Sequence, residues 1–353
     1  MTAALGYVAV SLLVVIAVLA VIDGVVRLAA RRNERISQQL RPAAIAVLGE
    51  YLAEDARLPR AEGRTQRAVM LQVGLEALGD LQGAERDRIA DMLDRLGFVE
   101  EARAGLRSRR RAVRRRAAEA LALIGTPSAL SALGPALADR DVLVRTAAAR
   151  LLAEVGDDEA ARAAVAVAEQ DVRHAPGGVA AVVLALAKSH EAAVGQMLRP
   201  GADARIKAIA ISVAGALRLA SLGPALRACL TERDDIAAAA ATGLGRIGET
   251  MAVPALMVLA CDESRAAEAR TAAAEALGAI ADPAAVPALG ALLGAEDWSL
   301  RTAAAQGLAE LGADGLAALR SAAASANPEV RETAGAQAAK GDDPPQPSEG
   351  APS

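Results

Sequence analysis

RTAAAEALGAIADPAAVPALGALL, residues 270–293, is the stretch that predicts the fold, because it reads as two short helices. Behind Arg270, apolar residues recur every three or four positions, which is the spacing of one buried helix face. Asp282 and Pro283 end this first helix, since a proline ring fixes φ and moves the preceding residue out of the helical region. A second apolar face follows over residues 286–293. Neither helix can bury its face alone, so each requires a neighbouring copy.

Copies of this pattern recur along the chain, with successive intervals of 31, 28, 32, 32, 33, 31 and 30 residues. The anchor positions, equivalent to Arg270, are Arg114, Arg145, Arg173, Arg205, Ala237, Arg301 and Arg331. Eleven residues after an anchor stands a small turn residue, at Gly125, Gly156, Gly248, Ala281 and Gly312. Such a period is typical of a stack of two-helix units that share one core, so the repeats predict an all-α superhelix.

The amino-acid sequence of the repeats indicates one class of helical repeat. Residues 144–149 (VRTAAA) and 286–289 (VPAL) resemble the short HEAT-like repeats of bilin lyases, and the resemblance extends over residues 111–335. It implies a HEAT-like solenoid in which the arginine-bearing helix lines the concave side. The fifth position after each anchor would then project into the groove, at Glu119, Arg150, Ala210, Thr242, Glu275 and Gln306. Tetratricopeptide repeats need aromatic packing residues, and only 1% of this chain is aromatic.

The repeated arginine is predicted to be structural. Asp141 lies four residues before Arg145, and Asp297 lies four residues before Arg301. We expect each carboxylate to hold its guanidinium in a fixed fork that ties one unit to the next. The predicted structural arginines are Arg114, Arg145, Arg205, Arg270, Arg301 and Arg331.

Two units depart from the pattern. Residues 176–178 (PGG) stand where a first helix should begin, so we expect a shifted helix start or a local bend. Ala237 replaces the arginine of its unit. That unit should keep its fold, because its apolar positions and its turn glycine are retained.

Residues 3–22 contain no charged side chain and are long enough to cross a bilayer as a helix. The sequence therefore predicts a transmembrane anchor over residues 1–23, followed by the superhelix. A cleaved signal peptide and a buried core helix are the alternatives. The anchor is followed, but not preceded, by basic residues, at Arg27, Arg31, Arg32, Arg35 and Arg41. Basic residues stay on the cytoplasmic side, so we expect a single-pass protein of the cytoplasmic membrane with its repeats in the cytoplasm.

The segments that flank the array are also predicted. Residues 24–41 read as a basic juxtamembrane stalk, or as a helix that lies on anionic headgroups. Residues 42–110 read as a degenerate helical N-terminal cap of a repeat array over residues 111–340, with helices near 43–54, 65–81, 85–96 and 98–106. Residues 341–353 contain four prolines and no apolar face, which predicts a disordered tail.

Charge is distributed unevenly along the chain. Residues 101–116 carry eight arginines and one glutamate, a net charge of +7, whereas residues 231–300 carry four basic and eleven acidic side chains, a net charge of −7. The basic patch comprises Arg107, Arg109, Arg110, Arg111, Arg115 and Arg116. It could be a solvated helix start, a contact with an anionic membrane surface, or a nucleic-acid contact. No stacking aromatic residues accompany it, so nucleic acid is the least favoured partner.

No constellation for catalysis or metal binding stands out, so the sequence predicts no enzyme, cofactor or metal. His174 and His190 are the only histidines, and the iron site of the HEAT-like deoxyhypusine hydroxylases uses several His-Glu pairs where this chain has His190-Glu191 alone. Cys229 and Cys261 have no zinc-binding spacing and are expected to be core thiols. We expect Trp298 to fill the core between units; the alternative is a partner-binding anchor.

These observations predict a membrane-tethered cytoplasmic scaffold that binds a protein partner through its repeats. Bacterial proteins of similar layout accompany membrane-embedded polysaccharide machinery, which makes a membrane glycosyltransferase the expected partner. A bilin-lyase-like accessory factor and a nucleic-acid-binding HEAT protein are the alternatives.

Overall fold

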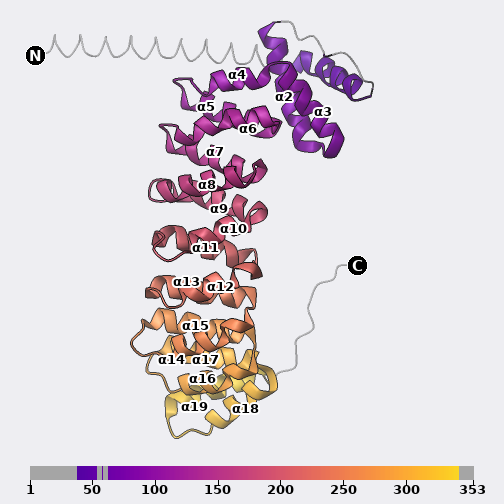
Figure 1. Cartoon of the computed structure of the whole chain (residues 1–353). Helices are drawn as coiled ribbons and strands as arrows, with labels where there is room; N and C mark the ends of the chain where they lie inside the picture. The colour runs from indigo at the N-terminus through magenta and orange to yellow at the C-terminus, as the bar shows by residue number, and fades with distance from the viewer. Residues whose placement is uncertain (1–37, 54–57, 59–62, 342–353) are drawn as a thin grey trace, which may run out of the picture. The chain divides into compact units, whose positions relative to one another are not determined.

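A computed structural model describes residues 38–53, 58 and 63–341 (Figure 1). Within these residues the chain forms helices and no strand, which confirms the all-α prediction for this part of the chain. The described chain divides into two compact units, one ending at Gly134 and the other beginning at Pro135. The predicted boundary between cap and array, at residue 110, stays a prediction.

The first unit contains a helix over residues 38–53 and five further helices. These are α2 (Arg64–Asp80), α3 (Gly83–Arg95), α4 (Phe98–Gly105), α5 (Arg111–Ile124) and α6 (Pro127–Leu133). The bounds of α2, α3 and α4 agree with the sequence prediction to within two residues. The core of this unit includes the only phenylalanine of the chain, Phe98, whose ring lies 4.7 Å from the guanidinium carbon of Arg67.

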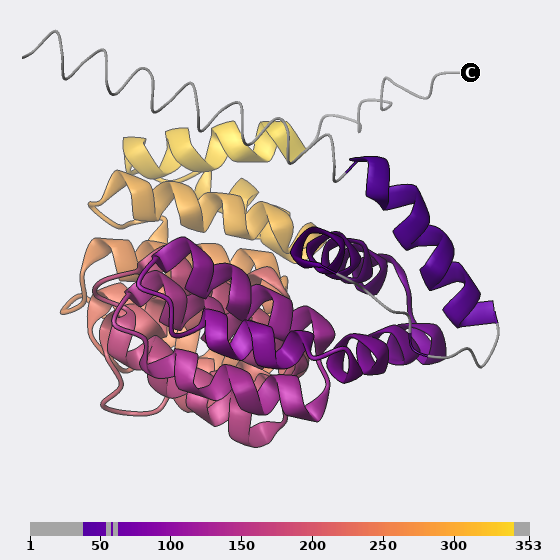
Figure 2. The same ribbon diagram turned by 90° about the horizontal axis from the view of Figure 1, so that it is seen from above.

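The second unit is a succession of helical hairpins (Figure 1). Its first helices are α7 (Val142–Val155), α9 (Pro176–Ser189), α11 (Ala204–Ala216), α13 (Asp234–Ile247), α15 (Ala267–Ile280), α17 (Trp298–Glu310) and α19 (Pro328–Gly341). Its second helices are α8 (Asp158–Asp171), α10 (Glu191–Met197), α12 (Gly223–Cys229), α14 (Val253–Cys261), α16 (Val286–Leu292) and α18 (Gly312–Ala322). Each first helix contacts the next, and one apolar core of alanine, leucine, valine and isoleucine extends from Ala149 to Ala338. Figure 2 shows the yellow helices of the C-terminal end packed side by side.

Small residues set the spacing of successive first helices. A Cβ atom at Gly245 would lie 2.9 Å from Ala276 Cα, and one at Gly278 would lie 2.5 Å from Gly307 Cα. In both contacts the glycine lies eight residues after the anchor of its own helix, and the residue that it approaches lies six residues after the anchor of the next first helix. The alanine and glycine content of the sequence therefore serves a close approach of helix backbones.

The helix starts correct the sequence register in two units. Most first helices begin three residues before their anchor, as α15 does at Ala267 before Arg270. The start of α9 at Pro176 confirms the predicted shift and makes Val179, not Arg173, the equivalent of an anchor. The start of α11 at Ala204 likewise makes Lys207 the anchor in place of Arg205. Arg205 is exposed, whereas Lys207 is buried and forms an ion pair with Glu232.

The corrected register explains the turns that end the first helices. Eleven residues after an anchor, φ is positive at Gly125, Arg218, Gly248, Ala281 and Gly312. A left-handed residue at this place ends a helix and satisfies its last carbonyl groups. Glycine adopts this conformation without strain, whereas Arg218 (φ 53°) and Ala281 (φ 58°) carry a Cβ that disfavours it.

Several predictions lie outside the described residues: the anchor over residues 1–23, Arg27, Arg31, Arg32 and Arg35 of the stalk, and all but the first residue of the tail. Among helices within residues 38–53 and 63–341, none combines the length and hydropathy needed to span a membrane. Arg41 lies at the start of the described chain, where its Nη1 donates to Glu76 Oε1 at 3.2 Å. Its charge is thus balanced within the first unit.

Candidate functional site

The anchor arginines bond to the backbone that precedes their own helix. Arg114, Arg145, Arg301 and Arg331 each donate from Nη1 to the carbonyl oxygen six residues earlier, at 3.0, 2.6, 2.6 and 3.0 Å respectively. Arg270 instead donates from Nε to Ala260 O at 3.1 Å. Each bond connects a first helix to the segment that leads into it, which is a structural arrangement.

The carboxylate partner of the anchor differs from the predicted one. Asp141 Oδ1 accepts from Leu143 N at 3.0 Å and caps α7, and Asp297 caps α17 in the same way. The fork at Arg145 is formed by Asp171 at the end of α8, with distances of 2.8 and 2.6 Å. Asp171 is only 1% exposed, and its hydrogen bonds raise the pKa of Arg145. The prediction for Asp141 and Asp297 was wrong, because an aspartate at a helix start satisfies the free N–H groups there.

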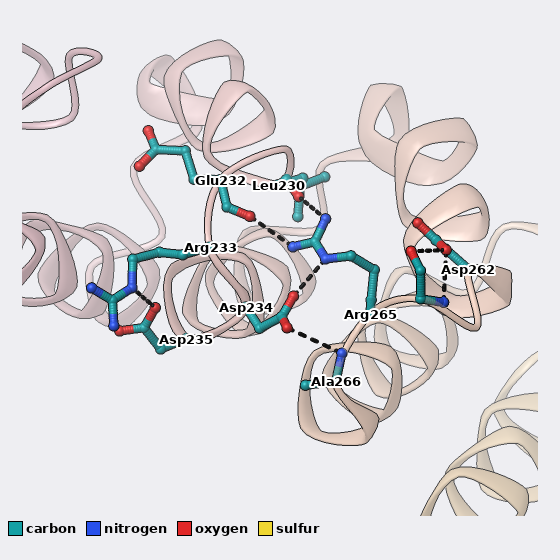
Figure 3. Close-up of polar contacts among 9 residues, drawn as sticks. Leu230, Glu232, Arg233, Asp234, Asp235, Asp262, Arg265 and Ala266 are labelled. Atoms are coloured by element: carbon teal, nitrogen blue, oxygen red, sulfur yellow. Dashed lines mark hydrogen bonds and ion pairs between the residues drawn. The ribbon is translucent and has the colours of Figure 1, made fainter.

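An arginine from the following unit takes the place of the missing anchor at Ala237 (Figure 3). Arg265, in the turn before α15, donates from Nη2 to Glu232 O at 2.7 Å and from Nη1 to Leu230 O at 3.4 Å. Its Nε also bonds to Asp234, whose other carboxylate oxygen accepts from Ala266 N at 3.1 Å. The bond from Arg265 lowers the pKa of Asp234. This network ties α13 to α15.

The exposed face of the first helices carries two pockets in the second unit. Thr242 and Glu275 are exposed and line one of them, and Gln306 is exposed and lines the other. Ala210 was predicted to share this face but is fully buried, because the anchor of α11 is Lys207. The fifth residue after Lys207 is Ser212, which is exposed. Two other predicted positions are partly exposed and lie beside charged neighbours, Glu119 at 3.4 Å from Arg115 and Arg150 at 2.6 Å from Glu154.

The arginine pocket has a volume of about 350 Å³ and lies across α13, α15 and the turn that follows α11. Its lining includes Arg218, Thr242, Gly245, Arg246, Gly248 and Glu275. Arg218 and Arg246 come from consecutive units, and among the described residues neither guanidinium has a partner. The sequence register hid Arg218, which falls on the turn position only when Lys207 is the anchor.

The tryptophan pocket has a volume of about 360 Å³ and lies across α17 and α19. Its lining includes Trp298, Arg301, Gln306, Glu329, Glu332 and Gln337. Trp298 is 68% exposed, so the prediction that it fills the core between units was wrong. As the first residue of α17 it lies outside the apolar stripe, which begins at Leu300. Arg301 is buried, and its Nη1 lies 3.0 Å from Glu329 Oε2.

The basic patch lies in the first unit, over the turn between α4 and α5 and the first turns of α5. Its six arginines are exposed, whereas Arg114 in their midst is 4% exposed and bonded to Ser108 O. No acidic residue lies in the first turn of α5, and no side chain caps it. Positive charge is therefore concentrated at a helix start, where the helix dipole adds to it.

The histidines and cysteines do not assemble into a site. Within residues 38–53 and 63–341, no group of histidine, cysteine or carboxylate side chains has the geometry of a metal site. His190 Nδ1 lies 3.5 Å from Asp158 Oδ1. Cys229 is buried, and burial raises the pKa of its thiol. Cys261 is exposed, so the prediction of a core thiol was wrong for this residue.

Comparisons with known proteins agree with this architecture. The model of a family described as HEAT repeats matches residues 99–187 and 223–309. Among solved structures, Kap121p superimposes with a TM-score of 0.50 at 12% identity, over 78% of this chain and 37% of Kap121p. The chain thus spans little more than a third of the length of that protein, and the likeness shows the fold alone. Human deoxyhypusine hydroxylase matches with a TM-score of 0.30 at 23% identity, over 69% of this chain and 97% of its own. No curated protein sequence matches the chain.

Proposed function

Because this chain is a HEAT-repeat protein, we propose that it is a scaffold which binds a protein partner through the exposed face of its first helices. The observation that carries this proposal is the row of first helices in the second unit, with two pockets on its exposed face. A stack whose backbones approach closely is rigid, so its surface can hold a partner with little loss of conformational freedom. The partner we propose is a membrane protein, and specifically a membrane glycosyltransferase.

Site-specific photocrosslinking in living cells tests which face binds. A benzophenone amino acid at Thr242 or Glu275 should give crosslinked protein adducts, because both positions are exposed on the first-helix face. The matched control places the same group at Ala255, which is exposed on the second helix α14. Mass spectrometry of the adducts identifies the partner. Adducts at Ala255 alone, or at none of the three positions, would contradict the proposal.

We further propose that residues 3–22 tether the scaffold to the cytoplasmic membrane with the repeats inside the cell. The uncharged run and the arginines that follow it support this topology. Cys261 provides a native probe, because it is exposed while Cys229 is buried. A membrane-impermeant maleimide should label the chain only after the cells are opened, and Cys261→Ser should remove the labelling. Labelling of intact cells would exclude this topology.

The basic patch favours a second role in the same setting, which is contact with anionic lipid. A basic side chain near an anionic surface contributes about 1 kcal/mol, and six exposed arginines lie together here. The full chain with Arg107, Arg110 and Arg116 replaced by Gln should show weaker salt-sensitive adsorption to phosphatidylglycerol vesicles than the unaltered chain. Equal adsorption, or preferential binding of duplex DNA, would refute the lipid contact.

A further inference from the structure

The two pockets of the first-helix face differ in charge. The arginine pocket contains two arginines and one glutamate, a net charge of +1. The tryptophan pocket contains one arginine and two glutamates, a net charge of −1. A partner that covers both pockets therefore needs a negative group at one and a positive group at the other.

Arg218 is the main evidence that the arginine pocket binds a ligand. Its φ of 53° places a non-glycine residue in the left-handed region at a position where Gly125, Gly248 and Gly312 stand in other units. Such an outlier is a pointer to a functional site. Ala281 shares the conformation without a polar side chain, so the argument for Arg218 rests on its exposed guanidinium as well. In the turns between units, by contrast, Arg173 is paired with Asp203 and Arg265 with Asp234. Arg218 and Arg246 remain without a partner within the described chain, and two guanidinium groups in one pocket suit a carboxylate.

The tryptophan pocket suits a cation. Its indole is exposed, and an ammonium or guanidinium group over an indole ring is attracted by the ring quadrupole. Glu329 is occupied by Arg301, whereas Glu332 has no partner within the described chain. Arg301 is 7% exposed and its Nε–H has no acceptor within the described chain, so a carbonyl oxygen of a bound peptide backbone could accept from it.

The distance between the pockets sets the length of the ligand. The arginine pocket is centred on α13 and α15, and the tryptophan pocket on α17 and α19, two helix spacings further along. Packed helices lie about 9 Å apart, so the pockets are separated by about 18 Å. An extended chain covers this distance in about five or six residues.

We propose that the first-helix face binds an extended peptide segment with an aspartate or glutamate in the arginine pocket and a lysine or arginine in the tryptophan pocket, about five or six residues apart. This inference rests on the proposed scaffold function and names the chemistry of the partner segment.

Selection from a random 12-residue phage-displayed peptide library on the full chain in detergent tests the pattern. Enriched peptides should contain an acidic and a basic residue at the stated separation. A selected peptide, made synthetically, should quench or shift the emission of Trp298, the only tryptophan. Selection that enriches no such pair, or no peptide at all, would overturn the proposal.

Variants separate binding from folding. Arg218→Gly should weaken the peptide at least tenfold while raising the melting temperature, because it removes both the charge and the backbone strain. Arg246→Gln should also weaken binding, and in the double variant Arg218→Gly/Arg246→Gln changing the acidic residue of the peptide to its amide should have no further effect. Arg205→Gln, on an exposed arginine of α11 outside both pockets, is the control and should bind normally. Unchanged binding by Arg218→Gly and Arg246→Gln would overturn the assignment of the pocket. Adducts at Thr242 and Glu275 alongside such a result would leave the scaffold function standing.

Discussion

Gly278→Ala tests the idea that glycine sets the spacing of the first helices. The added Cβ would lie 2.5 Å from Gly307 Cα and 2.9 Å from Glu310 Oε2. Ordinary van der Waals contact begins at 3.4 Å, so α15 and α17 must separate by 3.4 − 2.5 = 0.9 Å. Overpacking of this kind costs about 1–3 kcal/mol, and the gain of alanine over glycine within a helix offsets about 1 kcal/mol. We expect a net loss of about 0–2 kcal/mol, centred on about 1 kcal/mol.

Thermal unfolding of the full chain, followed by circular dichroism at 222 nm, measures this loss. For a unit of this size, 1 kcal/mol corresponds to about 2–4 °C, so the melting temperature should fall by about 3 °C. Gly290→Ala in α16 is the control, because its Cβ would meet no atom within 4 Å. It should raise the melting temperature through helix propensity alone. If Gly278→Ala melts at or above the unaltered chain while Gly290→Ala behaves as expected, the close approach of backbones does not limit the packing.

Three further outcomes follow from the turns and ion pairs of the repeats. Ala281→Gly should raise the melting temperature by about 1–3 °C, because it relieves a left-handed alanine; a lower melting temperature would show that the turn carries no strain. Arg145→Ala should lower the free energy of unfolding in urea by about 3 kcal/mol, because the buried Asp171 carboxylate then loses both hydrogen bonds from the guanidinium. Arg205→Ala should change the free energy of unfolding by less than about 0.5 kcal/mol, because Arg205 is exposed. Equal effects of the two substitutions would refute the corrected register. The lowered pKa of Asp234 means that its carboxylate stabilises the fold above its unfolded pKa of about 3.9 and that this contribution is lost as the pH falls through the lower folded pKa. Melting temperatures measured from pH 7 to pH 2 should therefore decline more steeply below about pH 4 for the unaltered chain than for Asp234→Asn, and parallel curves would refute this.

The repeat architecture could be predicted because it depends on local features. Apolar spacing, prolines and turn residues determine where helices form, and they recur within about 30 residues of one another, as in residues 270–293. The HEAT-like resemblance follows from the same features and agrees with the family match over residues 99–187 and 223–309. Helix bounds such as those of α3 are therefore close to their predicted values.

The register in the irregular units could not be read from arginine spacing. Arg173 and Arg205 resemble anchors in sequence, yet Val179 and Lys207 occupy those positions in the helices. An anchor is defined by where its helix starts and which face is buried, and one irregular turn changes both. The error at Ala210 follows directly from this shift.

Sequence alone therefore determined the all-helical repeat and the uncharged run of residues 3–22, because helix propensity and hydrophobicity are properties of neighbouring residues. Only the tertiary structure decided which charged side chains form ion pairs or hydrogen bonds within the fold and which do not. Arg265 bonds across a unit boundary, whereas Arg218 and Arg246 come together in one pocket without partners in the described chain. The physical reason is that such pairings join residues about 30 positions apart, and they exist only after the backbones of adjacent helices have packed at the distance that their small residues allow.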